Sequence, residues 1–182
     1  HMKNIIFIGM PASGKSTVGV VVAKRLGLGF VDTDLLIQAQ EKKLLKEIIA
    51  EVGNEGFLKI EDEVNARVDV KKTVVSPGGS VVYCENAMKH YKEIGKILYL
   101  KVSFETISKR LRNAKKRGVV LRDGQTLEDL YNERVKLFEK YGVKATVGKR
   151  VSKGALNICV IHNAAYYEDM EDPYKEKHEG VA

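Results

Sequence analysis

Residues 4–17 read NIIFIGMPASGKST, a short apolar run that stops at a loop with two glycines. Such a run is typical of a strand in a parallel sheet, because helices cover both of its faces. After the loop, Val18, Val22 and Leu26 recur at helical spacing, and Gly27 ends the repeat. The stretch therefore predicts a strand, a glycine-rich loop and a helix in succession.

The rest of the chain continues this alternation. Candidate strands are segments 4–9, 30–31, 73–75, 96–102 and 155–161, and candidate helices lie near 18–26, 35–39, 44–49, 57–68, 85–91, 107–111 and 127–141. Gly53 interrupts the helical pattern between two of them. Alternating strands and helices predict an α/β fold, a three-layer α/β/α domain with a central parallel five-stranded sheet.

The length, apolar content, cysteine spacing and net charge of the chain limit which kinds of protein it can be. The 182 residues favour one domain, expected over residues 2–165 with a charged tail at 166–182. No apolar run approaches the roughly 20 residues of a membrane helix, and Cys84 and Cys159 lack C-x-x-C spacing, so a cytoplasmic protein with reduced thiols is expected. The net charge of +7 admits a nucleic-acid partner. No aromatic platform or zinc spacing supports one, and we expect a monomer that binds neither nucleic acid nor membrane.

Three loops follow predicted strands: the glycine-rich loop, residues 32–34 and residues 77–79. Ligands of open α/β sheets bind at the carboxyl ends of the strands. We therefore expect these loops to meet in one cleft.

The first loop matches the P-loop pattern Gly9-x-x-x-x-Gly14-Lys15-Ser16. Its glycines let backbone N–H groups point at phosphate oxygens, and the following helix adds its positive end. Lys15 supplies a charge at the β- and γ-phosphates, and the Ser16 hydroxyl can bind Mg²⁺. The pattern predicts Mg-ATP binding by Gly9, Ala12, Ser13, Gly14, Lys15, Ser16 and Thr17.

Two other P-loop classes lack their signatures here. No N-K-x-D motif, which reads guanine in GTPases, occurs in the chain. The strand at residues 97–100 runs into Lys101 and Val102, so no Walker B aspartate follows it. Both absences weigh against regulatory GTPases and motor ATPases.

Several further motifs follow the P-loop in a characteristic order. They are Asp32-x-Asp34, Gly53-x-x-Gly56-Phe57 with Glu61 behind it, the Gly78-Gly79 loop, and Arg117 with Arg134. In order and spacing they resemble the shikimate kinases, from about residue 3 to about residue 147. The resemblance implies a small cytoplasmic enzyme of the nucleoside-monophosphate-kinase fold. Such enzymes phosphorylate the 3-hydroxyl of shikimate with Mg-ATP in aromatic amino-acid biosynthesis.

Carried over to this sequence, the resemblance implies roles on the donor side. Asp32 would help Ser16 to hold Mg²⁺, through water. Arg110 would lie against the adenine. Arg117 would lie in a small lid at about residues 112–124 and reach the transferring phosphate, acting with Lys15 in catalysis.

The resemblance also implies roles on the acceptor side. Asp34 would orient the attacking hydroxyl and could deprotonate it. Glu61 would belong to the acceptor site, and Gly78 and Gly79 would present backbone N–H groups to the acceptor. Arg134 would grip the acceptor carboxylate.

The residues by themselves leave alternatives open. The Asp32–Asp34 pair could be a solvated polar loop or a helix N-cap at Asp34. Arg134 lies on the apolar face of its helix, between Tyr131 and Phe138, so its side chain either snorkels to solvent or points into a site. Lys115 and Lys116 are expected to be solvated surface charges.

The sequence departs from the family pattern in four features. Leu58 replaces an arginine that pairs with the acceptor carboxylate, and Pro77 replaces the first glycine of a Gly-Gly-Gly loop and removes a backbone donor. The lid motif Arg-Pro-Leu-Leu is Arg-Gly-Val-Val at residues 117–120, and no final amphipathic helix is evident. The acceptor side is therefore altered while the triphosphate side is intact.

These departures lead to a hypothesis with alternatives. The acceptor could be shikimate, or a related hydroxy acid or polyol. A kinase of the same fold for a gluconate-like polyol or a nucleoside monophosphate is one alternative. A nucleotide-binding regulatory protein with little turnover is another, and the intact Lys15, Ser16, Asp32 and Asp34 argue against it.

Overall fold

The computed structural model describes residues 3–112, 119 and 121–145. Within them, one parallel sheet has the strand order β2-β3-β1-β4-β5. The strands are β1 (Asn4–Ile8), β2 (Gly29–Asp32), β3 (Thr73–Ser76), β4 (Gly95–Leu100) and β5 (Val143–Ala145). This confirms the predicted five-stranded parallel sheet.

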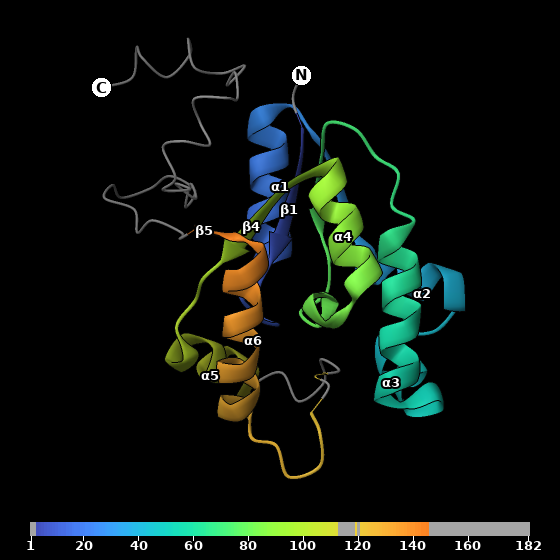
Figure 1. Cartoon of the computed structure of the whole chain (residues 1–182), viewed down its shortest axis with the longest axis vertical. Helices are drawn as coiled ribbons and strands as arrows, with labels where there is room; N and C mark the ends of the chain where they lie inside the picture. Colours follow the sequence, from blue (N-terminus) through green and yellow to red (C-terminus); the bar gives the residue numbers. More distant parts are fainter. Residues whose placement is uncertain (1–2, 113–118, 120, 146–182) are drawn as a thin grey trace.

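Helices cover both faces of the sheet (Figure 1). Helix α1 (Lys15–Leu26) packs Val18 and Val22 against Phe7 of β1 on one face. On the other face, α4 (Glu85–Ile94), α5 (Phe104–Arg112) and α6 (Leu127–Tyr141) cover Ile8 and Tyr99. Because β1 has a layer on each side, every residue of it is buried, which explains its unbroken apolar sequence.

Helices α2 (Thr33–Glu41) and α3 (Leu45–Ala66) pair through an apolar cluster of their own that includes Ile37 and Phe57. Gly53 interrupts α3, as the sequence predicted, with a non-helical φ of 71°. The two helices expected on either side of Gly53 are thus the arms of one kinked element. Its second arm packs against α4.

Two elements differ from the sequence prediction. The short helix η1 (Val81–Tyr83) was not foreseen, and neither was β5, which has only three residues, two of them exposed. A segment of that length carries no alternation to detect. The strand expected at residues 155–161 and the tail at 166–182 lie outside the described residues.

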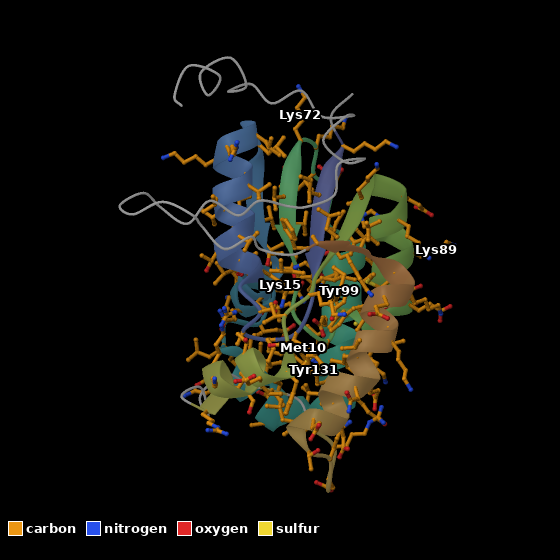
Figure 2. All side chains as sticks on the ribbon, turned by 90° about the vertical axis from the view of Figure 1, so that its left-hand side faces the viewer. Met10, Lys15, Lys72, Lys89, Tyr99 and Tyr131 are labelled. Atoms are coloured by element: carbon orange, nitrogen blue, oxygen red, sulfur yellow. The ribbon has the colours of Figure 1, made fainter. Side chains whose placement is uncertain are left out.

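The carboxyl ends of the strands all face one end of the sheet. Figure 2 shows Lys15 and Met10 toward the end opposite Lys72, which precedes β3. Among the helices of the described ranges, none combines the length and the apolar character needed to cross a bilayer.

Candidate functional site

The glycine-rich loop connects β1 to α1 and is tied together by Lys15. Its Nζ donates hydrogen bonds to the carbonyl oxygens of Gly9, at 2.9 Å, and Met10, at 2.8 Å. A side chain on Gly9 would place its Cβ 2.9 Å from the Leu100 carbonyl oxygen, so only glycine fits there. Burial lowers the pKa of Lys15 to about 8, against the opposing effect of the nearby Asp34 carboxylate. The loop thus holds a desolvated cation at the start of a helix.

A hydroxyl and a carboxylate meet beside this loop. Ser16 Oγ donates to Asp32 Oδ2 at 2.9 Å and lies 3.3 Å from Ser76 Oγ, at the end of β3. No group of three or more His, Cys, Asp or Glu side chains suited to a metal occurs in the described part of the chain. One hydroxyl and one carboxylate fit Mg²⁺, which keeps several waters and takes its other oxygens from phosphates.

Asp32 also begins helix α2. Its Oδ1 accepts a hydrogen bond from the backbone N–H of Asp34 at 3.0 Å, which makes Asp32 the N-cap residue. The alternative of an N-cap at Asp34 is therefore wrong, because the cap lies two residues earlier. Capping fixes the direction of Asp32 and leaves the Asp34 carboxylate free to line the cavity.

The environment of Asp34 favours its protonated form. Burial raises the pKa of Asp34 to about 6, and the negative charge of Asp32 adds to this rise, while the Lys15 ammonium opposes it. A carboxylate with a pKa near the working pH is suited to accept a proton.

Glu61 projects from the second arm of α3 and is fully buried. Ser80 Oγ donates a hydrogen bond to Glu61 Oε2, and Glu61 Oε1 has no hydrogen-bond partner among the described residues. Burial raises the pKa of Glu61 to about 7, although the Ser80 hydrogen bond opposes the rise. A buried acceptor atom without a partner is uncommon and marks a place where a ligand group can bind.

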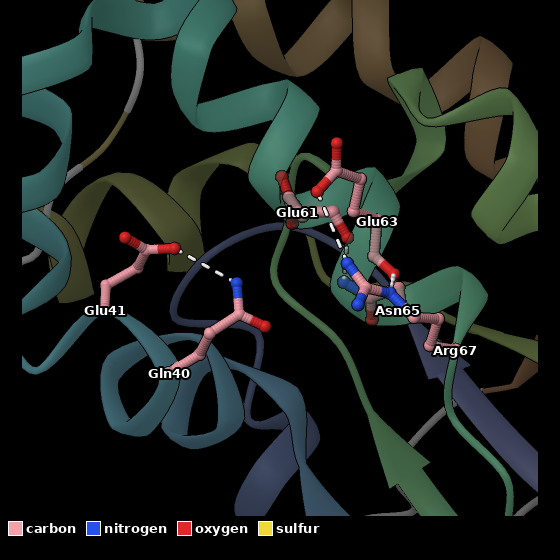
Figure 3. Close-up of polar contacts among 6 residues, drawn as sticks. All are labelled: Gln40, Glu41, Glu61, Glu63, Asn65 and Arg67. Atoms are coloured by element: carbon pink, nitrogen blue, oxygen red, sulfur yellow. Dashed lines mark hydrogen bonds and ion pairs between the residues drawn. The ribbon is translucent and has the colours of Figure 1, made fainter.

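A buried amide fixes the backbone at Glu61. Asn65 Nδ2 donates to the Glu61 main-chain oxygen at 2.7 Å (Figure 3). Tyr91 of α4 in turn donates to Asn65 Oδ1 at 2.5 Å. Helix α3 is therefore anchored to α4 where it presents Glu61.

The glycines after β3 fit closely between the other loops. A Cβ on Gly78 would lie 2.8 Å from both Asp34 Oδ1 and Glu61 Oε1. A Cβ on Gly79 would lie 2.6 Å from Pro11 Cδ. Gly78 thus separates the two carboxyl groups, and Gly79 packs against the P-loop.

We predict that Gly78→Ala lowers kcat/KM for the acceptor by about 10- to 100-fold, because its methyl group displaces both carboxyl groups. ATP binding should be unchanged, and steady-state kinetics with each substrate varied in turn measures both effects. Gly27→Ala is a matched control at the far end of α1, where φ is 66°. This control should lose stability and keep kcat/KM, and equal losses in both variants would contradict the prediction.

Arg134 of α6 is 2% exposed, so its side chain does not snorkel to solvent. Its guanidinium carbon lies 5.3 Å from the centre of the Tyr83 ring, and its Nε has no hydrogen-bond partner among the described residues. Its Nε is therefore a buried donor that an anion could satisfy.

These groups line one cavity of about 600 Å³ at the carboxyl ends of the strands. Its walls include the three predicted loops through Gly14, Lys15, Ser16, Asp32, Asp34, Pro77, Gly78 and Gly79, together with Glu61, Ser80, Val119 and Arg134. The expected convergence of the loops is confirmed, and Arg134 and Glu61 join them from α6 and α3.

The sequence also predicted two donor-side residues outside these loops, Arg110 and Arg117. Arg110 of α5 is exposed and donates from NH1 to the Ala12 carbonyl oxygen at 2.9 Å, so it lies against the P-loop. Arg117 and most of the expected lid lie outside the described residues.

Sequence reasoning missed Ser80 and Tyr83, which contact Glu61 and Arg134. The available signal was their place directly after the Gly78-Gly79 loop, at the start and end of η1. Leu58 is half-buried and packs with the core under α4 and α6. Because leucine has no hydrogen-bond donor, the side chain at position 58 cannot pair with Glu61, whose carboxyl group accepts from the Ser80 hydroxyl.

A glycine loop that carries a buried lysine, placed between the first strand of a parallel sheet and its helix, defines a P-loop nucleotide-binding fold. The sequence profile of the shikimate kinase family matches residues 11–160. The chain belongs to the shikimate kinase family, whose members are phosphotransferases with an alcohol group as acceptor.

Individual relatives agree with this assignment. A shikimate kinase of a Sulfurihydrogenibium species is 33% identical over 150 residues, which cover 82% of this chain and 90% of the relative. One from Clostridium botulinum is 36% identical over 144 residues, covering 76% and 84%. The structure of the Acinetobacter baumannii shikimate kinase in complex with shikimate superimposes with a TM-score of 0.73 at 26% identity, covering 83% and 86%.

Proposed function

We propose that the protein transfers the γ-phosphoryl group of Mg-ATP to a hydroxyl of shikimate or of a closely related hydroxy acid. The observation that carries the proposal is the shared cavity, which Lys15 of the P-loop lines together with Asp34, Glu61 and Arg134. The names of the relatives, and the shikimate bound to one of them, point to the same acceptor class.

On the donor side, the N–H groups of the loop and the Lys15 ammonium would bind the phosphates. Phosphoryl transfer depends mainly on positioning and on positive charge around the transferring group. Ser16 and Asp32 would hold Mg²⁺, which neutralises phosphate charge. Arg110 would contact the adenine, and Arg117 would approach the γ-phosphate from the proposed lid.

On the acceptor side, Asp34 would accept the proton of the attacking hydroxyl and orient it toward the γ-phosphate. Its raised pKa suits that task near neutral pH. Arg134 would bind the acceptor carboxylate, since no carboxylate of the described residues is bonded to its Nε. Glu61 and the backbone at Gly78 and Gly79 would hold the remaining hydroxyls.

Purified full-length protein tests this proposal through ADP formation from Mg-ATP. Shikimate, quinate, gluconate, homoserine and nucleoside monophosphates should each be offered as acceptor. We expect turnover with shikimate or quinate and none with the nucleotides. No turnover with any acceptor, together with tight ATP binding, would contradict the proposal and favour a regulatory protein.

We predict that Leu58→Arg lowers KM for shikimate by about tenfold or more and changes kcat much less. The new guanidinium would add a second cation for the carboxylate, and a charge-assisted hydrogen bond contributes about 1.5–3 kcal/mol. Val52→Arg places the same charge on an exposed site of the same helix and should leave KM unchanged. Equal KM values in Leu58→Arg and the wild type would contradict a role of Leu58 in acceptor affinity.

A further inference from the structure

A second cavity of about 460 Å³ lies beside the first. The two cavities have Ser80 and Arg134 in common as lining residues. Sites for small molecules usually have volumes of about 300–1,000 Å³, so this cavity can hold part of a ligand. The proposed binding of Mg-ATP and of the acceptor takes place in the first cavity and does not require this second one.

Apolar atoms contribute the larger part of the surface of this second cavity, although polar and charged residues also line it. Leu58 of α3, Tyr83 of η1 and Leu130 of α6 contribute to it, and Leu130 is 2% exposed. On the α3 side, the uncharged side chain of Leu58 lines the cavity. Glu55, Arg122 and Asp123 also line it and are exposed to solvent.

The carboxylate of Glu133, which also lines this cavity, already has its partners. Tyr83 OH donates to Glu133 Oε1 at 2.5 Å, and Gln125 Nε2 donates to Oε2 at 3.3 Å. Arg122 NH2 lies 3.6 Å from the same carboxylate. These groups give the Glu133 carboxylate its partners, so Glu133 does not need a ligand group, while Glu55 and Asp123 carry charge on the exposed part of the lining.

Arg134 contributes to the walls of both cavities. Its buried Nε lacks a partner among the described residues, so the guanidinium can take an anion from the main cavity. A carboxylate held there would bring the neighbouring part of the same molecule toward Leu58 and Tyr83.

We propose that the second cavity extends the acceptor site and takes an uncharged, largely apolar substituent next to the acceptor carboxylate. The preferred acceptor is then a hydroxy acid bulkier than shikimate. This inference rests on the proposed function, because it needs the carboxylate on Arg134. It goes beyond that function by naming the residues that select the acceptor: Leu58, Tyr83 and Leu130.

The test compares shikimate with a derivative that carries a propyl group on the ring carbon next to the carboxyl-bearing carbon. Calorimetry in the presence of Mg-ADP gives both dissociation constants without any need for turnover. We expect the propyl derivative to bind about tenfold tighter than shikimate, since its methylenes leave water for an apolar wall. The derivative should also show the higher kcat/KM when ATP is supplied.

Leu58→Trp fills the cavity and should abolish this preference. Val52→Trp adds the same ring to an exposed position of α3 outside both cavities and should retain it. Equal or weaker binding of the propyl derivative by the wild-type protein would overturn the inference while leaving the proposed function intact. Tight binding of both acids without phosphorylation of either would instead overturn the proposed function.

Discussion

Replacing Lys15 by alanine is expected to lower kcat for phosphoryl transfer by at least about 10³-fold, because the variant loses the buried cation beside the transferring phosphate. Lys15 is 7% exposed, so water does not screen its charge. Its Nζ spans the loop between two carbonyl oxygens and lies where the phosphates would bind. Stopped assays of ADP formation at saturating acceptor measure the loss.

This loss should not come from unfolding. Burial has lowered the pKa of Lys15 below its ordinary value, so its charged form makes the folded state less stable below a pH of about 8. Alanine removes that cost and two hydrogen bonds together, and the midpoint of thermal unfolding should stay within about 4 °C. Lys24→Ala, on an exposed position of the same helix, should keep full activity. Substantial turnover by Lys15→Ala would contradict the P-loop assignment.

The sequence correctly predicted the strand, loop and helix that make up the P-loop, because their pattern is local. A P-loop is one continuous stretch, and the strand, loop and helix around it each carry a clear pattern. Asp32 is the last residue of β2 and pairs with Ser76 at the end of β3, and Ser16 contacts both side chains.

The acceptor half depends on contacts between distant segments, which no local pattern encodes. Ser80 and Glu61 are 19 residues apart in the sequence, yet Ser80 donates to the Glu61 carboxyl group. Tyr83 meets Arg134 because η1 packs against α6, and η1 is too short to show a period. The sequence could mark Leu58 as unusual, but only the packing shows the second cavity that this side chain lines.

The two carboxyl groups beside Gly78 lower the stability of the folded state when they ionise. Asp34 and Glu61 both approach this glycine, and burial raises the pKa of each carboxyl group. A raised pKa means that ionisation weakens the folded state, so stability is lost as the pH rises through about 6 for Asp34 and about 7 for Glu61. The protein thus keeps two destabilising carboxyl groups that an acceptor with several hydroxyls would satisfy.

Asp34→Asn is expected to lower kcat by about 10²- to 10⁴-fold, the usual contribution of a positioned general base. The amide can still orient a hydroxyl but cannot take its proton, so KM for the acceptor should change much less than kcat. In the wild type, kcat/KM should rise with pH through about 6, because Asp34 must lose its proton to act and its pKa is raised to about 6. The variant should lack that rise.

The same substitution should make the fold more stable at neutral pH. The neutral amide avoids the ionisation of Asp34, so the free energy of unfolding at pH 8 should increase by on the order of 1 kcal/mol, and at pH 4 the two proteins should agree. Thermal unfolding at the two pH values measures this difference. Asp69→Asn, at an exposed position, is the control and should change neither property. A gain in stability with a loss of turnover would identify Asp34 as a group retained for chemistry at the expense of the fold. If Asp34→Asn kept its turnover at pH 8, the proton of the hydroxyl would have to leave by another route.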